Sequence, residues 1–137
     1  MKTTVADASF CGAWILQDEV SPEADELLKQ IERGSAELLL PALWHYEMLN
    51  LLRSALRRER IDRSMATEAI ELLDEIPVRD FDLPDRRARR LALDLAVRHN
   101  LSAYDASYLE LALRLGASLH SNDRPLKAAA KAEGLST

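Results

Sequence analysis

The chain has 137 residues, of which 47% are hydrophobic and 30% charged, a balance that suits one folded domain and excludes a disordered or low-complexity protein. Its single cysteine excludes an internal disulfide bond, and no Cys/His cluster offers the ligands of a structural zinc site. The formal net charge of −5 opposes nucleic-acid binding at long range, but arginines gather at 53–60 and 86–90, so net charge alone does not decide the partner.

No segment of the sequence is typical of a membrane span or a signal peptide. The longest apolar run, Leu38–Trp44, is short and contains Pro41, and residues 1–4 are too polar for a signal sequence. We therefore expect a cytoplasmic protein that makes no membrane contact.

Strands and helices alternate along the predicted chain. Capping residues, glycines and apolar periodicity set the boundaries, as at Ser21, Pro22 and Gly34 around the second helix. The predicted strands are Thr3–Ala6, Glu37–Leu40, Val78–Phe81 and Ser118–Ser121. The predicted helices are Ser9–Leu16, Pro22–Arg33, Leu43–Arg58, Asp62–Ile76, Pro84–Asn100, Ser102–Gly116 and Pro125–Glu133.

This alternation predicts one α/β domain over residues 1–137, a three-layer α/β/α sandwich around a mostly parallel sheet of four to five strands. Open sheets of this kind bind ligands outside the carboxyl ends of their strands. Asp7 and Asp123 follow the first and the fourth predicted strand, so we expect both at that edge. Taken alone, either acid is better explained as a helix cap or first-turn charge than as a site residue.

Asp105 and Glu47 lie on helices and carry the same ambiguity. Ser102 and Asp105 match a capping box, yet Asp105 shares a helical stripe with the apolar Tyr108 and therefore points toward the interior. Glu47 borders the stripe of Trp44 and Met48, where glutamates are usually solvated. Asn50 continues this polar border, either to hydrogen-bond the site or as a surface residue.

Together, the four acids Asp7, Glu47, Asp105 and Asp123 supply the hard oxygen ligands that Mg²⁺ or Mn²⁺ prefers. A divalent cation would relieve their mutual repulsion and could activate water against a phosphodiester. The residues alone therefore indicate a metal-dependent hydrolase without naming its substrate.

Four segments resemble the PIN-domain family, particularly its VapC-type toxins. They are Val5–Ser9, Pro41–Asn50, Leu101–Ala106 and Ser121–Leu126, in the family's order and at suitable separations. The resemblance implies a Mg²⁺- or Mn²⁺-dependent endoribonuclease, the toxin of a toxin–antitoxin pair, with RNA as substrate, a cognate antitoxin as partner and a homodimer as the frequent assembly.

Carried over by residue, the resemblance identifies Asp7, Glu47, Asp105 and Asp123 as the catalytic and metal-binding quartet. It places Ser9 and Ser121 at small hydroxyl positions near the metal. Ser121 stands where the family more often has threonine. The family also usually adds a last edge strand after the final helix, which Leu135-Ser136-Thr137 leaves short or absent.

Other polar residues are weaker candidates. The arginine cluster within residues 86–90 is typical of a solvated helix face. Arg124 could contact a substrate phosphate. His45 and His120 are not required as bases where metal-bound water is available. The tyrosines Tyr46, Tyr104 and Tyr108 could stack bases, although aromatic residues beside apolar stripes are more often core.

Two alternatives to the ribonuclease remain open. The first is a PIN-fold binding module that engages an antitoxin-like protein but does not cleave RNA, and the presence of all four acids counts against it. The second is a phosphoacceptor regulatory domain, which also gathers acids at strand ends. It fits poorly because no lysine follows a late strand beside the expected pocket.

Overall fold

A computed structural model describes residues 1–82 and 84–137. In chain order the elements are β1 (Lys2–Ala6), α1 (Ala8–Cys11), the 3₁₀ turn η1 (Gly12–Trp14), α2 (Pro22–Glu32), β2 (Ala36–Pro41), α3 (Leu43–Arg57), α4 (Arg63–Glu75), β3 (Arg79–Phe81), α5 (Arg86–His99), α6 (Ala103–Leu115), β4 (Ser118–His120) and α7 (Arg124–Ala132). The alternation predicted from the sequence is confirmed.

The four strands form one parallel sheet in the order β3-β2-β1-β4. Val5 is paired with Leu119 and Thr4 with Leu38, so β1 is flanked on both sides. Leu38, Leu39 and Leu40 are all buried, as expected for a strand covered on both faces. The described residues contain no fifth strand, but the Leu119 N–H donates to the Ser136 carbonyl at 2.9 Å, so the last segment touches the β4 edge.

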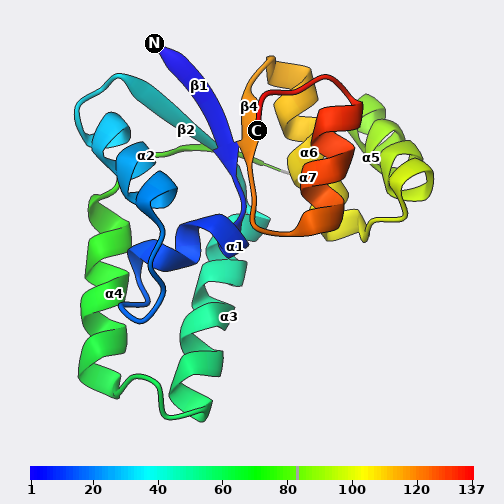
Figure 1. Ribbon diagram of the computed structural model, residues 1–137. Coiled ribbons are helices and arrows are strands. Elements are labelled where there is room, and N and C mark those ends of the chain that lie inside the picture. Colours follow the sequence, from blue (N-terminus) through cyan, green and yellow to red (C-terminus); the bar gives the residue numbers. More distant parts are fainter. Residues whose placement is uncertain (83) are drawn as a thin grey trace.

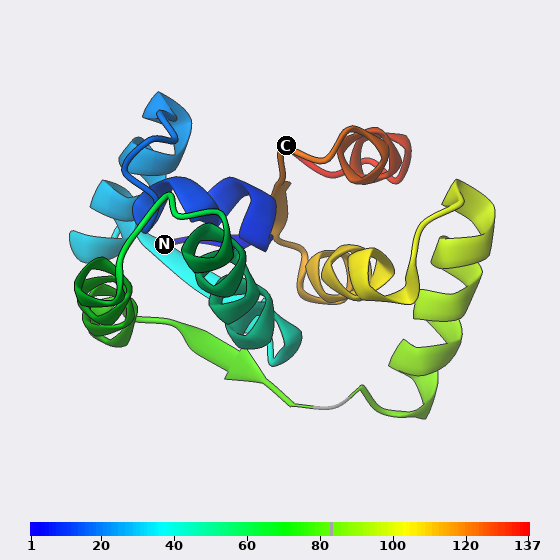
Figure 2. The same ribbon diagram turned by 90° about the horizontal axis from the view of Figure 1, so that it is seen from below.

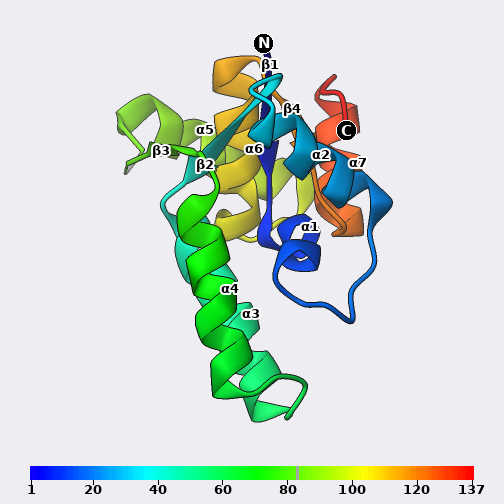
Figure 3. The same ribbon diagram turned by 90° about the vertical axis from the view of Figure 1, so that its left-hand side faces the viewer.

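Helices cover both faces of the sheet (Figure 1). Helix α6 contacts β1, β2 and β4 and lies on the same side as α5 and α7, whereas α1, α2, α3 and α4 lie on the other side. Figures 1 and 3 show α3 and α4 projecting together beyond the end of the sheet. The three-layer α/β/α sandwich is thereby confirmed.

The core forms where these layers meet. Trp44 and Met48 of α3 and Tyr108 and Leu109 of α6 are almost entirely buried. Each fully buried large apolar side chain contributes about 1.5–3 kcal/mol relative to exposure. These same helices carry Glu47 and Asp105, so core packing fixes the position of two of the predicted site residues.

Two predicted helix boundaries are wrong. The expected helix Ser9–Leu16 is a single α-turn, α1, followed by η1, where the Ile15 N–H donates to the Gly12 carbonyl at 3.1 Å. Gly12 is close-packed, because a Cβ there would lie 3.2 Å from Leu51 Cδ1. Helix α5 begins at Arg86 rather than Pro84, because the Asp85 carboxylate caps it by accepting the Ala88 N–H at 2.8 Å.

None of the helices in residues 1–82 and 84–137 combines the length and the apolar character needed to cross a membrane.

Candidate functional site at the carboxyl edge of the sheet

The carboxyl ends of β1 and β4 are held side by side. The Asp7 N–H donates to the His120 carbonyl at 3.1 Å, which extends the β1–β4 ladder by one bond past Ala6. Asp7 and the segment Ser121–Asp123 therefore emerge at the same edge, onto which Figure 2 looks from below. The placement of Asp7 and Asp123 expected from the strand ends is found in the structure.

The Asp7 carboxylate lies at the centre of a hydroxyl network. Ser121 Oγ donates to Asp7 Oδ2 at 2.6 Å, and Ser9 Oγ donates to Asp7 Oδ1 at 2.7 Å. Asp7 Oδ1 also caps α1 by accepting the Phe10 N–H at 3.1 Å. Burial raises the pKa of Asp7 above its usual value, although these hydrogen bonds from Ser121, Ser9 and Phe10 work in the opposite direction.

Ser9 and Ser121 also connect Asp7 to Asp123. The Asp123 N–H donates to Ser121 Oγ at 2.9 Å, and the Asn122 N–H donates to Ser9 Oγ at 2.9 Å. The Asn122 side chain donates to the Ser9 carbonyl at 3.0 Å. Sequence reasoning missed Asn122, whose only signal is its place between Ser121 and Asp123.

Glu47 is held by a contact that the sequence does not reveal. The hydroxyl of Tyr108, on α6, donates to Glu47 Oε1. Burial raises the pKa of Glu47, the nearby charges of Asp7 and Asp105 raise it further, and the Tyr108 hydrogen bond opposes both. Tyr108 is a core aromatic, as expected, but its polar end faces the candidate site.

Asp105 occupies the first turn of α6. Its N–H donates to Ser102 Oγ at 3.1 Å, which confirms the capping role of Ser102. The side chain is half-buried, and burial followed by the charge of Asp123 raises its pKa. The capping interaction with Ser102 and the partial burial of the Asp105 side chain therefore occur together. The interpretation of Asp105 as part of a capping box and its interpretation as a site residue do not exclude each other.

The four acids form one electrostatic group. The charge of Asp105 acts on Asp7 and Glu47, and the charge of Asp123 acts on Asp105. Among residues 1–82 and 84–137, no lysine, arginine or histidine forms an ion pair with any of the four. The structure thus gathers carboxylates from four segments without compensating positive charge.

The donor set suits a hard divalent cation, because carboxylate oxygens are its preferred protein ligands. In the described part of the chain, however, no three Asp, Glu, His or Cys side chains have closed into a metal-holding arrangement. Glu47 is instead bound to Tyr108, and Asp7 to Ser9 and Ser121. The chemistry fits a cation, and ligation would require some of these side chains to turn.

Asn50 is not connected to this group. Its side chain is exposed and forms no hydrogen bond with any residue that the structure describes. His120 lies close to Phe10, with ring centroids 5.1 Å apart, and burial lowers its pKa. This packing agrees with the structural interpretation of His120.

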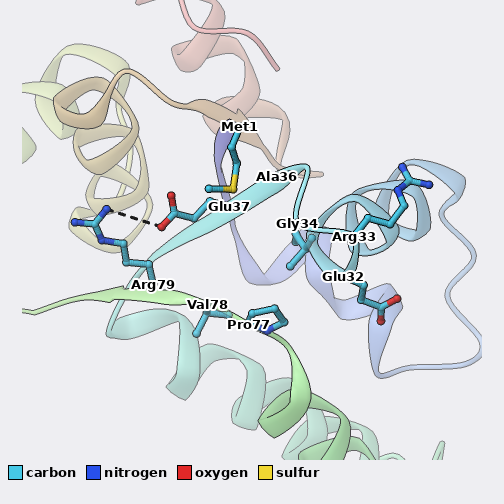
Figure 4. A pocket seen from close by; sticks show the side chains of 10 residues that line it. Met1, Glu32, Arg33, Gly34, Ala36, Glu37, Pro77, Val78 and Arg79 are labelled. Carbon is cyan, nitrogen blue, oxygen red and sulfur yellow. Dashed lines mark ion pairs between the residues drawn. The ribbon is translucent and has the colours of Figure 1, made fainter.

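The opposite end of the sheet carries a cavity of about 430 Å³ (Figure 4). It is lined by residues of α2, of the start of β2 and of the segment entering β3. Of its two acids, Glu32 and Glu37, the second faces Arg79, with 3.8 Å between Glu37 Oε1 and Arg79 Nη1. A larger cavity of about 500 Å³ is lined by residues of α5 and α6. Volume therefore does not select a site, whereas the unpaired carboxylates point to the carboxyl edge.

The fold and the site together define a class of protein, namely parallel α/β sandwiches that group carboxylates at the carboxyl edge of the sheet. The PIN-domain family matches residues 4–132. The chain is 31% identical over 126 residues to Ribonuclease VapC3 of Pyrobaculum aerophilum, covering 89% of this chain and 90% of that protein. The chain therefore belongs to the PIN-domain family, and the resemblance to its VapC-type members is confirmed.

Solved structures agree on the fold. The protein PAE2754 of Pyrobaculum aerophilum matches with a TM-score of 0.70 and 27% identity, over 93% of this chain and 79% of that one. VapC20 of Mycobacterium tuberculosis, described as a toxin that cleaves the sarcin-ricin loop, matches with a TM-score of 0.60 and 17% identity, over 92% and 94% of the two chains.

Proposed function

We propose that this protein is a Mg²⁺- or Mn²⁺-dependent endoribonuclease and the toxin of a toxin–antitoxin pair. The observation that carries the proposal is the convergence of Asp7, Glu47, Asp105 and Asp123 without a basic partner among the described residues. Like charges at this density are costly unless a cation neutralises them. The 31% identity to Ribonuclease VapC3 supports RNA as the substrate.

In this proposal the four acids hold the cation, and the hydroxyls of Ser9 and Ser121 orient Asp7. A bound Mg²⁺ or Mn²⁺ supplies an activated water and neutralises charge on the phosphodiester. Tyr108 holds Glu47 beside the other three acids, where its carboxylate would be available to a bound cation. Asn50, which is exposed on α3, takes no part in this arrangement.

The decisive experiment measures cleavage of a panel of structured RNAs by the purified protein in Mg²⁺, Mn²⁺ or EDTA. Asp105→Asn removes one charge from the site, and Asp94→Asn removes one from the exposed face of α5 as a matched control. We expect cleavage only with metal, loss of cleavage in Asp105→Asn and full activity in Asp94→Asn. Metal-independent cleavage, or full activity of Asp105→Asn, would contradict the mechanism.

A second readout does not depend on finding the right RNA. A ligand present at 100 times its dissociation constant stabilises the folded state by about 2.7 kcal/mol. Mn²⁺ should therefore raise the melting temperature of the wild type and of Asp94→Asn, and raise that of Asp105→Asn less. A Mn²⁺ response without cleavage of any RNA would favour the non-catalytic binding module.

The partners follow from the same proposal. We infer a cognate antitoxin and a second copy of this chain as protein partners, in the cytoplasm. Leu93 and Val97, four residues apart on α5, are both large, apolar and exposed, as in a helix face that packs against another protein. Light scattering of the wild type and of Leu93→Glu tests the homodimer, because a charge in that interface would shift the mass to that of one chain.

A further inference from the structure

The exposed face of α3 is basic beyond Glu47. Tyr46, Asn50, Arg53 and Arg57 recur every three or four residues and are all exposed, so they share one face of the helix. We name these four residues the α3 strip. Residues 48–58 contain no acid. Because α3 starts at the sheet and projects away from it (Figure 3), the strip leads outward from the carboxylate group.

The arginines of the α3 strip differ from several others on the surface. Arg60 donates to Asp18 Oδ2 at 2.9 Å and to Asp18 Oδ1 at 2.7 Å, and Arg98 donates to Glu133 at 2.9 Å. By contrast, neither Arg53 nor Arg57 forms an ion pair or a side-chain hydrogen bond with a residue that the structure describes.

At the end of the helix, Arg57 lies beside further polar groups. With Ser54 and Arg58 it lines a small hollow of about 150 Å³. Two guanidinium groups and a hydroxyl that can also donate lie at one hollow, and such donors bind phosphate oxygens. In a chain with a net charge of −5, this is a local exception suited to an anionic partner.

We propose that the α3 strip binds single-stranded RNA on its way to the carboxylate group, with Arg53 and Arg57 on phosphates and Tyr46 stacked on a base. The inference rests on the proposed ribonuclease function. Arg57 is ten residues beyond Glu47, which is about 15 Å along a helix axis and so spans more than one nucleotide. By contacting phosphates of the RNA outside the site, the two arginines would offset the repulsion between the four acids and the RNA backbone.

An RNA strand fits this face better than an acidic protein helix does. A partner helix would require a continuous apolar stripe, but Leu49 is the one large aliphatic side chain exposed on α3. Tyr46 is 73% exposed on the same face as the arginines. Arginines for the backbone and an aromatic ring for a base are the usual combination in single-strand binding.

The arginines of α5 provide a matched control. Arg89 and Arg90 are also exposed and lie near the start of α5, whereas α5 ends at His99, just before α6 and Asp105. They are therefore separated from Asp105 by most of a helix, about 15 Å at 1.5 Å per residue. They form a pair of exposed arginines on a different helix, so their removal reports the effect of losing two positive charges away from the α3 strip.

The test measures binding of a fluorescein-labelled decauridylate by anisotropy, in the Asp105→Asn background with Mg²⁺, so that binding is read without cleavage. Each phosphate contact to a single strand adds about 0.7 to the salt slope, which corresponds to about fivefold in affinity at 0.1 M salt. Arg53→Gln with Arg57→Gln should therefore weaken binding about 25-fold and flatten the slope by about 1.4. Arg89→Gln with Arg90→Gln should change neither appreciably.

Tyr46 separates stacking from charge. Stacking on one base is worth about five- to a hundredfold in affinity, so Tyr46→Ala should lose that factor and Tyr46→Phe should retain it. An unchanged salt slope in the α3 double variant, or an equal loss in the α5 control, would overturn the proposal. Tighter binding of a decaglutamate peptide than of decauridylate would overturn it too, in favour of an acidic protein partner.

The same variants distinguish this inference from the ribonuclease itself. If the α3 double variant changes neither metal-dependent RNA cleavage nor decauridylate binding, the ribonuclease function is supported and the RNA-binding role of the α3 strip is contradicted. If decauridylate binding depends on the α3 strip but no RNA is cleaved, the RNA-binding role of the strip is supported and the ribonuclease function is contradicted. All four substituted arginines are exposed, so equal melting temperatures should verify that each variant is folded.

Discussion

The two ends of the sheet differ in whether a basic side chain pairs with their acids. At the amino end, Glu37 faces Arg79 beside a cavity of about 430 Å³. At the carboxyl edge, four acids lie without a basic partner among the described residues, and the pKa values of Asp7, Glu47 and Asp105 are raised. Functional sites tend to occur where charges are left uncompensated, and the cavity at the amino end is therefore the weaker candidate.

The difference follows from how parallel sheets are built. Each strand end at the carboxyl edge leads into the start of a helix, and Asp7 and Asp123 cap α1 and α7 there. A cap needs an acceptor oxygen, and a cation site needs several. The local rule that places an acid at one helix start therefore collects acids from distant segments at one edge.

The largest expected effect is on RNA cleavage. Asp105→Asn removes a carboxylate from the proposed cation site, whereas loss of a residue that only supports a metal ligand typically costs 10–100-fold. We therefore expect cleavage to fall by more than about 100-fold, measured as kcat/KM on any RNA that the wild type cuts. Glu37→Gln, which removes an acid at the other end of the sheet, serves as the control. Comparable losses in both variants would abolish the contrast between the two ends.

The second effect is on stability as a function of pH in EDTA. Asp7, Glu47 and Asp105 have raised pKa values in the folded protein, so their protonated forms are favoured by folding. The stabilisation from protonation is complete below the unfolded pKa values near 4 and is lost as the pH rises through the raised values. These three acids should therefore raise the melting temperature as the pH falls from 7 toward 5, whereas His120, whose pKa is lowered by burial, acts in the opposite direction.

Asp105→Asn should be more stable than the wild type at pH 7 in EDTA and should show a shallower rise toward pH 5. The physical reason is that the amide does not ionise next to Asp123. Calorimetry at several pH values measures this. A rise toward pH 5 that is as steep in Asp105→Asn as in the wild type would show that Asp105 takes no part in it.

Much of this fold could be read from the sequence because its signals are local. Ser21, Asp62 and Ser102 each cap a helix through their own side chains, and the left-handed conformation of Gly116 follows the end of α6. The strand ends likewise placed Asp7 and Asp123 together. By contrast, the local pattern did not show that α1 ends at Cys11, nor that Gly12 lies close to Leu51, a residue far away in the chain.

The contacts that shape the site were harder to predict for the same reason. Tyr108 and Glu47 are 61 residues apart, and Asn122 and Ser9 are 113 apart. Helical periodicity showed that Tyr108 is core and that Glu47 lies at a border, but it could not show that α3 and α6 bring the two together. Only the packing of both helices on the sheet determines that pairing.

The third effect concerns this pairing. Tyr108→Phe removes the hydroxyl that donates to Glu47, and because Glu47 is half-exposed we expect a loss of only about 1 kcal/mol in the free energy of unfolding. Urea denaturation in EDTA measures it. Tyr104→Phe is the control, since Tyr104 is 66% exposed. A loss that persists in a Glu47→Ala background, which has no side-chain acceptor, would show that the hydroxyl acts elsewhere.

The smallest effect belongs to the amino end of the sheet. Glu37→Gln breaks the contact with Arg79, where the charged atoms are 3.8 Å apart and the arginine side chain is 64% exposed. Solvent screens such a pair, so the free energy of unfolding should change by less than about 0.5 kcal/mol. Equilibrium urea unfolding at low and high salt measures it, with Arg79→Gln as the partner variant and the double variant closing the cycle. A coupling free energy between Glu37 and Arg79 well above about 0.5 kcal/mol would mean that this ion pair stabilises the fold. The two ends of the sheet would then differ in their contribution to stability as well as in charge.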